Sequence, residues 1–209
     1  MSRWLLIFCL FACAPAQALN FWQDEWQVPA QLQTNDYVLT PLSNDDATAF
    51  YKAYFSSQSF LYHQLGWAWP SEKATPEMNT EMVRYQVEQH IQRRAFTFII
   101  RPRNKDTIVG ALYLVPTLEQ RSDVPGLAEQ QYDAELSWWL TERESSSDSA
   151  ERLLSQVLPW LATQWPWQNL LLPVATTNEV ALAQVRRQGL SQVAEDNDNA
   201  TLFFSYRAR

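Results

Sequence analysis

The feature that most constrains the fold is a block of three apolar strand patterns, at 95–103, 107–117 and 132–140, between stretches with helical periodicity. The short polar turn RNKD joins the first two patterns, which is typical of a hairpin. Strands joined by so short a turn pair antiparallel. We therefore predict a sheet built around this block, with helices before and after it.

Strand and helix patterns also alternate outside this block. A strand at 37–43 precedes helices at 44–60 and about 78–94; a long helix from about Ser149, a strand at 169–176, a short helix closed by Gly189 and a last strand at 200–208 follow the block. Helices segregated from antiparallel strands in this way are typical of α+β domains. The order predicts one mixed, mostly antiparallel sheet flanked by helices.

Composition narrows the classes of partner. The chain has 209 residues, 46% of them hydrophobic, which is enough to bury the core of one domain. Its formal net charge is −7 and it contains no basic run. Nucleic acids and anionic membrane surfaces are bound through clustered Lys and Arg, so we expect neither as a partner.

Residues 1–18 form a separate segment. Arg3 precedes an apolar run that ends near Ala14, and the residues AQA follow just before Leu19. This is the layout of a secretory signal peptide, and the run is shorter than the roughly 20 apolar residues of a membrane span. We expect cleavage and export of the chain. A buried N-terminal helix is the alternative.

The predicted domain boundaries follow from this segment. After the signal peptide come an aromatic leader at 19–36 and a single domain at 37–209. Cys9 and Cys13 both lie in the signal peptide, so a mature chain would have neither thiol nor disulfide. An alternative keeps Cys13, because the LFAC sequence that ends there resembles a lipoprotein processing box. The protein would then be lipid-anchored rather than periplasmic, if its source is a Gram-negative bacterium.

Two local sequences and the order of the elements resemble a known family. The strand AELSWWL at 134–140 and the stretch ATTNEVALAQVRRQGL at 175–190 are similar to motifs of the GNAT superfamily of acyl-CoA-dependent N-acyltransferases. Within it, the chain resembles the RimJ/RimL-like branch, which modifies ribosomal-protein N-termini and related amines. The resemblance covers about residues 36–206 and implies a single GNAT-like domain.

The resemblance also implies a reaction and a donor site. Acetyl-CoA would be the co-substrate, and a small-molecule or peptide amine would be the acceptor. The donor's pantetheine arm would enter beside Trp139 and Leu140, where the strand ends, and Asn178 would bind this arm. The loop residues Ser146, Ser147, Asp148 and Ser149 would face the donor's pyrophosphate, as helix N-termini do in general.

This loop departs from the family pattern. Its two glycine positions fall at Ser146 and Asp148. A carboxylate at Asp148 is expected to cap the helix and to repel a diphosphate. We therefore expect weak donor binding or none.

Catalytic candidates are few. Glu135, with Asp133 two residues earlier on the same strand face, stands where the family keeps a carboxylate that accepts the amine's proton. The alternatives are a solvent-facing or Arg-paired carboxylate for Glu135, and a helix N-cap for Asn178. The helix that begins at Asn178 has no Tyr, so the family's general acid is not assigned. His63 and His90 do not indicate a metal site, and none is expected.

Two functions follow as hypotheses. The first is a GNAT-type N-acetyltransferase with a divergent donor loop, exported from the cytoplasm. The second is an exported GNAT-fold protein without catalytic activity that serves as a binding or envelope module. If the signal peptide prediction fails, a cytosolic acetyltransferase is a third reading.

Overall fold

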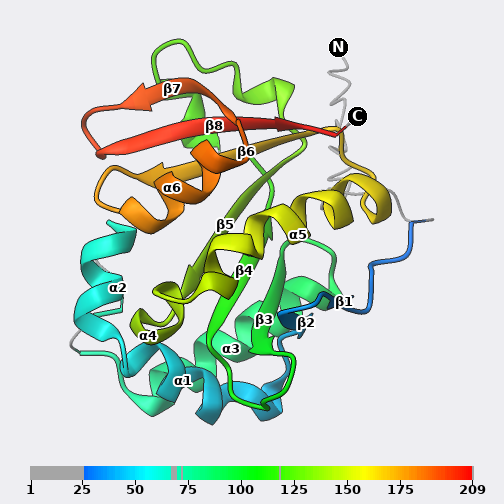
Figure 1. Ribbon diagram of the computed structural model, residues 1–209, viewed down its shortest axis with the longest axis vertical. Helices are drawn as coiled ribbons and strands as arrows, with labels where there is room; N and C mark the ends of the chain where they lie inside the picture. The colour runs from blue at the N-terminus through cyan, green and yellow to red at the C-terminus, as the bar shows by residue number, and fades with distance from the viewer. Residues whose placement is uncertain (1–25, 67–69, 72, 118, 209) are drawn as a thin grey trace, which may run out of the picture.

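The computed structural model describes residues 26–66, 70–71, 73–117 and 119–208. The predicted signal peptide, including Cys13, and part of the predicted leader lie outside these ranges. In the described residues, an eight-stranded sheet has the order β1-β2-β3-β4-β5-β6-β8-β7 (Figure 1). The α-helices lie on both faces of this sheet (Figure 1).

The strands are β1 (Leu32–Gln33), β2 (Tyr37–Pro41), β3 (Phe96–Pro102), β4 (Gly110–Val115), β5 (Ala134–Leu140), β6 (Asn169–Ala175), β7 (Ser191–Asp196) and β8 (Thr201–Arg207). The α-helices are α1 (Ala47–Phe55), α2 (Gln58–Leu65), α3 (Pro76–Ile91), α4 (Glu142–Ser145), α5 (Asp148–Gln164) and α6 (Glu179–Arg187). Short 3-10 turns are η1 (Asn44–Asp46), η2 (Glu119–Asp123) and η3 (Glu129–Gln131).

The pairing confirms the predicted sheet. Neighbouring strands run antiparallel, including the β3–β4 hairpin, except that β5 and β6 run parallel. The sheet is therefore mixed and mostly antiparallel, in a single α+β domain as the resemblance implied. The long crossover between β5 and β6 contains α4 and α5, as a parallel pair requires.

Alternation along β5 divides its side chains between two cores. Leu136 and Trp138 pack with α5 and α6 on one face of the sheet. Trp139 packs with α1, α2 and α3 on the other. Successive side chains of a strand point to opposite faces, so Glu135 shares the face of Trp139. Both faces are covered, which explains why the AELSWWL pattern is almost continuously apolar.

The structure corrects three expected elements. Residues 61–65 were expected in a loop but belong to α2, which ends at Gly66 with φ of +68°. The single helix expected at 44–60 is divided in two, since α1 ends at Phe55 and α2 begins at Gln58. The edge strand β7 was not predicted, because most of its side chains are exposed and polar, without the apolar alternation of a half-buried strand.

The end of the leader packs on the domain. The Trp26 indole N–H donates to the carbonyl of Gln164 at 3.0 Å. Its ring lies 4.9 Å from that of Trp165 and 6.2 Å from that of Phe96, between centroids. Trp26, the one aromatic residue of the leader that the structure describes, thus packs against the core on the α5 face.

Candidate active site

The parallel strands β5 and β6 diverge. Only two residue pairs are in register, Ala134 with Leu170 and Glu135 with Leu171. Beyond them, β5 continues to Leu140 beside β4, and β6 continues beside β8. The strands open toward α2, α4 and the start of α6 (Figure 1). This is the position at which the pantetheine arm was expected to enter.

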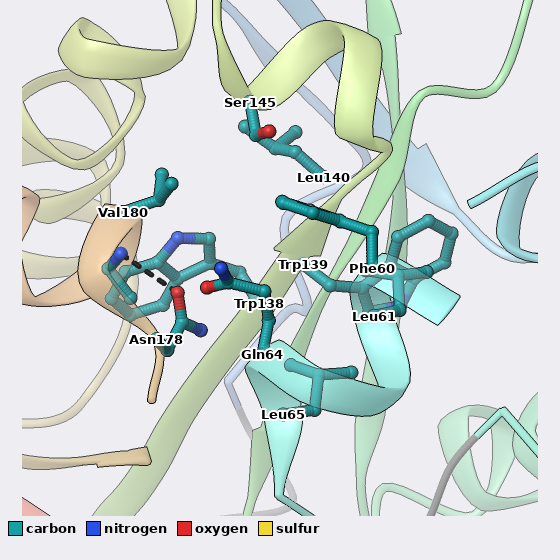
Figure 2. A pocket seen from close by; sticks show the side chains of 11 residues that line it. Phe60, Leu61, Gln64, Leu65, Trp138, Trp139, Leu140, Ser145, Asn178 and Val180 are labelled. Atoms are coloured by element: carbon teal, nitrogen blue, oxygen red, sulfur yellow. Dashed lines mark hydrogen bonds between the residues drawn. The ribbon is translucent and has the colours of Figure 1, made fainter. Parts of the chain in front are cut away.

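Side chains fill the opening between the two strands. The remaining hollow has a volume of about 20 Å³, lined by Phe60 and Gln64 of α2 together with Trp138, Asn178 and Val180 (Figure 2). A single water molecule needs roughly 10–15 Å³ of such volume. The opening therefore holds about one water, and a pantetheine arm needs these side chains to move.

Trp138 is the best-anchored of these side chains. It is 6% exposed, and its indole N–H donates to the side-chain oxygen of Gln184 at 2.8 Å. The Gln184 amide in turn donates to the carbonyl of Ala150 in α5. This chain of bonds ties Trp138 to both helices that cover its face of the sheet.

Asn178 has the capping role that was the alternative to donor binding. Its side-chain oxygen accepts the backbone N–H of Ala181 at 3.0 Å, which makes it the N-cap of α6 (Figure 2). The same side chain lines the hollow beside Gln64 and Trp138. The prediction of a cap is confirmed, and the predicted contact with a pantetheine arm stays a prediction.

The loop between β5 and α5 differs from the expected extended cradle. Residues Glu142–Ser145 form the single turn α4, and the N-cap of α5 is Ser147, whose hydroxyl accepts the N–H of Ala150 at 3.1 Å. Asp148 is the first helical residue, so the expectation that it caps the helix is wrong. Ser147 takes that role because it keeps an extended backbone, with ψ of 153°.

Three backbone donors of this loop are used within the protein. The N–H of Glu142 donates to the hydroxyl of Ser57, and those of Ser145 and Ser147 donate to the carbonyls of Thr141 and Glu144. The Glu144 carboxylate also accepts the Tyr37 hydroxyl at 2.6 Å. These contacts fix a compact, acidic loop where a phosphate cradle needs free N–H groups.

Arg152 of α5 and Arg187 of α6 are ion-paired. Arg152 bonds to both oxygens of Asp36, at 2.8 and 3.0 Å, and Arg187 pairs with Glu151 at 2.6 Å. The Arg152 guanidinium, aided by Gln156, lowers the pKa of Asp36 to about 2. Ser149, expected to face the donor, also donates to Asp36. The Asp36 contacts hold the end of the leader against α5, and the Arg187–Glu151 pair joins α6 to α5.

A larger cavity lies on the face of the sheet that α3 covers, opposite α5 and α6. Its volume is about 860 Å³, and α3, β4, β5, β6, η2 and the β7–β8 turn contribute to its walls. The lining residues are Gly66, Met82, Gln86, Tyr113, Val115, Arg121, Glu135, Ser137, Pro173, Ala175, Asp198, Asn199, Ala200 and Thr201. Apolar walls with a few polar groups are typical of small-molecule sites.

The structure separates the two predicted catalytic carboxylates. Glu135 lines the large cavity, is 3% exposed, and accepts two bonds of 2.9 Å from Arg121. Asp133 accepts the backbone N–H groups of Gln168 and Asn169, each at 2.8 Å, and so stabilises the start of β6. The Arg-paired alternative for Glu135 is thus the one that the structure shows.

Two residues of this cavity were missed from the sequence. Arg121 lies in the link between β4 and β5, and no motif marks it. Tyr113 is the strand partner of Ser137, which hairpin alternation could have indicated. Its hydroxyl accepts the indole N–H of Trp139 at 3.0 Å. Burial raises the pKa of Tyr113 well above its usual value, so this hydroxyl keeps its proton.

The two sides of the sheet meet at one place. Ser137, Pro173 and Ala175 line the 860 Å³ cavity and also a second small hollow between β5 and β6. Asn178 lines this second hollow as well as the first one, beside Phe60 and Gln64. A molecule reaching through the strand opening would therefore approach a molecule in the cavity beside Ser137.

The described part of the chain contains no group of three or more His, Cys, Asp or Glu side chains arranged to hold a metal ion. In the same residues, no helix is both long and apolar enough to cross a membrane.

Comparisons with known proteins agree with this geometry. Residues 37–191 match the model of the acetyltransferase (GNAT) domain. A search of curated proteins found no match. Among solved structures, the chain is similar to the ribosomal-protein-S5-alanine acetyltransferase of Vibrio fischeri, at 14% identity and a TM-score of 0.66, covering 86% of this chain and 97% of that one.

Two further structures carry ligands. One is RimL, a ribosomal L7/L12 α-N-protein acetyltransferase in complex with coenzyme A, at 15% identity, a TM-score of 0.64, and coverage of 86% and 97%. The other is the microcin C7 self-immunity acetyltransferase MccE with acetyl-CoA and AMP, at 12% identity, a TM-score of 0.66, and the same coverage. At these identities the similarity shows the fold, and the matched domain model shows the family. The chain belongs to the acetyltransferase (GNAT) domain family.

Proposed function

We propose that the protein is an N-acetyltransferase that moves the acetyl group of acetyl-CoA to an amine held in the 860 Å³ cavity. The observation that carries this proposal is the meeting of the two sides of the sheet at Ser137, Pro173 and Ala175. A thioester that enters between β5 and β6 would present its carbonyl there. An amine in the cavity would approach from the opposite face.

In the proposed reaction, the neutral amine nitrogen forms a bond to the thioester carbon, the carbon–sulfur bond breaks, and the leaving thiolate takes up a proton from water. Glu135 is the buried carboxylate on the acceptor side and accepts the amine's proton, directly or through water. Asp133 is not among the residues that line the cavity and its carboxylate is bound at the start of β6, which favours Glu135 for this role. The Tyr113 hydroxyl remains a hydrogen-bond donor.

The proposed donor contacts are those that the family resemblance implied. The arm would pass Trp139, Leu140 and Asn178, and the diphosphate would lie at residues 146–149. Because the loop is acidic and closed, we expect the arm to contribute more to affinity than the diphosphate does. Acetyl-CoA is therefore expected to bind weakly.

Calorimetry and thermal shift test this proposal. Purified protein is titrated with acetyl-CoA and, in parallel, with S-acetylpantetheine, which lacks the diphosphate. A ligand that binds the native state raises the melting temperature. We expect both donors to bind with similar affinity. A Gln64→Ala variant, which removes a side chain from the opening, should bind both more tightly, whereas Gln58→Ala at the start of α2 should not.

A second candidate is a GNAT-fold module that binds an amine without transferring an acetyl group. It is favoured by the closed loop, by the pairing of Arg152 and Arg187 with carboxylates of α5 and the leader, and by the 20 Å³ hollow. The same titrations separate the two. If neither donor binds at millimolar concentration while an amine does bind, the transferase proposal is wrong and the module remains.

We also propose that the protein is exported, on the basis of residues 1–18. A fusion to alkaline phosphatase, which is active only outside the cytoplasm, tests this. Palmitate labelling of the wild type and of Cys13→Ser distinguishes a lipid anchor from cleavage before Leu19. An inactive fusion would favour the cytosolic reading.

A further inference from the structure

Arg121 lies at the wall of the large cavity. It lies in η2, in the link between β4 and β5. Buried Val124 and Leu127 of this link pack against Leu171 and Phe203 of the sheet. The Arg121 guanidinium carbon lies 5.0 Å from the centre of the Phe203 ring. The packing of this link and the contact with Phe203 thus place the guanidinium at the cavity wall.

Glu135 occupies only one edge of this guanidinium. The N–H of Nε donates to Oε1 and one N–H of Nη2 donates to Oε2, both at 2.9 Å. A guanidinium has five N–H groups, and in the described residues the structure gives the other three no partner. Two of these three, on Nη1 and Nη2, form the second edge, which presents parallel donors.

The second edge matches a carboxylate. Two parallel N–H groups bind the two oxygens of a carboxylate together, which is the strongest geometry that Arg offers. The side chain of Arg121 is 20% exposed while that of Glu135 is 3% exposed, and both line the cavity. The accessible part of the pair is therefore the cation.

Other lining residues fit the rest of such a ligand. Asp198 and Asn199 of the β7–β8 turn line the cavity and suit an ammonium group approaching from outside. Met82, Val115 and Pro173 supply apolar walls. A cavity with a fixed guanidinium, carboxylates and apolar walls suits a small amine that also carries a carboxylate.

We propose that Arg121 determines acceptor specificity by binding a carboxylate of the acceptor, so that the cavity takes amino acids with an apolar side chain. This inference rests on the proposed acceptor role of the cavity. It narrows the substrate from amines in general to amines with a free carboxylate. Glu135 holds the guanidinium in place for this contact.

Binding without any donor tests the inference directly. The probes are phenylalanine, phenylalaninamide and 2-phenylethylamine, which share a ring and an amine and differ in the carboxylate. By calorimetry, we expect wild-type protein to bind phenylalanine at least about tenfold more tightly than either of the others, as a lost charge-assisted pair implies. Equal binding of the acid and the amide, or binding of none at millimolar concentration, would overturn the inference.

Variants sharpen the test. Arg121→Lys keeps a positive charge beside Glu135 but loses the parallel donors. It should lose the preference for phenylalanine while its weak binding of 2-phenylethylamine is unchanged. Arg84→Lys, an exposed arginine paired with Glu81 on α3, is the matched control and should keep the preference. If Arg121→Lys does not fold, the three probes on wild-type protein still decide.

Transfer is measured separately with acetyl-CoA. Acetylation of all three probes at similar rates would overturn the role of Arg121 and leave the transferase proposal intact. Carboxylate-dependent binding without acetylation would overturn the transferase proposal and leave the role of Arg121 intact.

Discussion

At the scale of single residues, the Arg121–Glu135 pair is the most informative contact of the candidate site. Sequence reasoning identified Glu135 from the family strand and left open whether an arginine pairs with it. The arginine itself was not predictable, because a 3-10 turn 14 residues earlier in the chain brings it there. This contact depends on how the link between β4 and β5 packs on Leu171 and Phe203. Local sequence patterns do not predict that packing.

Breaking this pair should cost stability. Glu135→Gln leaves Arg121 as a largely buried charge without its counter-ion, and we expect the free energy of unfolding to fall by about 3 kcal/mol. The double variant Glu135→Gln with Arg121→Gln should be less destabilised than Glu135→Gln alone, since no uncompensated charge remains. Urea unfolding of the three proteins measures this, and additive losses would contradict the buried-pair account.

At the scale of elements, the start of α5 shows what a sequence pattern can and cannot decide. Ser147 and Asp148 are both good capping residues. Their order in the chain does not say which one keeps the extended backbone. The structure assigns the cap to Ser147 because the preceding turn α4 places it just outside the helix. The helix itself was predictable from its apolar periodicity, and its first residue was not.

The cap assignment predicts unequal losses. Ser147→Ala removes the acceptor of the Ala150 N–H and should destabilise the protein by about 1 kcal/mol. Asp148→Asn removes only a charge in the first turn and should cost about 0.5 kcal/mol. Thermal unfolding compares the two. A larger loss from Asp148→Asn would mean that Asp148 is the true cap.

The other elements can also be divided into those that the sequence predicts and those that it does not. Strands of the central block were predictable because they are buried on both faces and strongly apolar. The C-terminal turn of α2 was not, since aromatic and polar residues without clear periodicity surround it. The edge strand β7 was hidden for a different reason, because hydrogen bonds to β8 rather than buried side chains hold it in the sheet.

At the scale of the whole molecule, two groups with shifted pKa values contribute to the acid stability. Burial lowers the pKa of His90 to about 4, and Arg152 lowers that of Asp36 to about 2. Both groups release their proton more readily in the folded state, so the unfolded state binds more protons as the pH falls. Stability is therefore complete at neutral pH and is lost on acidification, first through His90 and then through Asp36.

The two losses fall in different pH ranges. Between pH 6.5 and 4, the His90 contribution of at most about 3 kcal/mol should disappear, and His90→Gln should remove this slope. Between about pH 4 and 2, Asp36 should account for a further loss of at most about 2 kcal/mol, which Asp36→Asn should abolish. Urea unfolding across this range measures both. A slope that persists in His90→Gln would assign the loss to other groups.

The filled opening between β5 and β6 also limits the rate of donor binding. A hollow of about 20 Å³ admits no thioester arm, so α2 and its neighbours must part before the proposed donor enters. In rapid mixing, the observed binding rate should then rise with acetyl-CoA concentration only to a plateau, whose height is the rate of opening. The apparent affinity is lowered by the rarity of the open form, whatever contacts that form makes. The movement of helix α2 would thus set the maximum rate at which the donor binds.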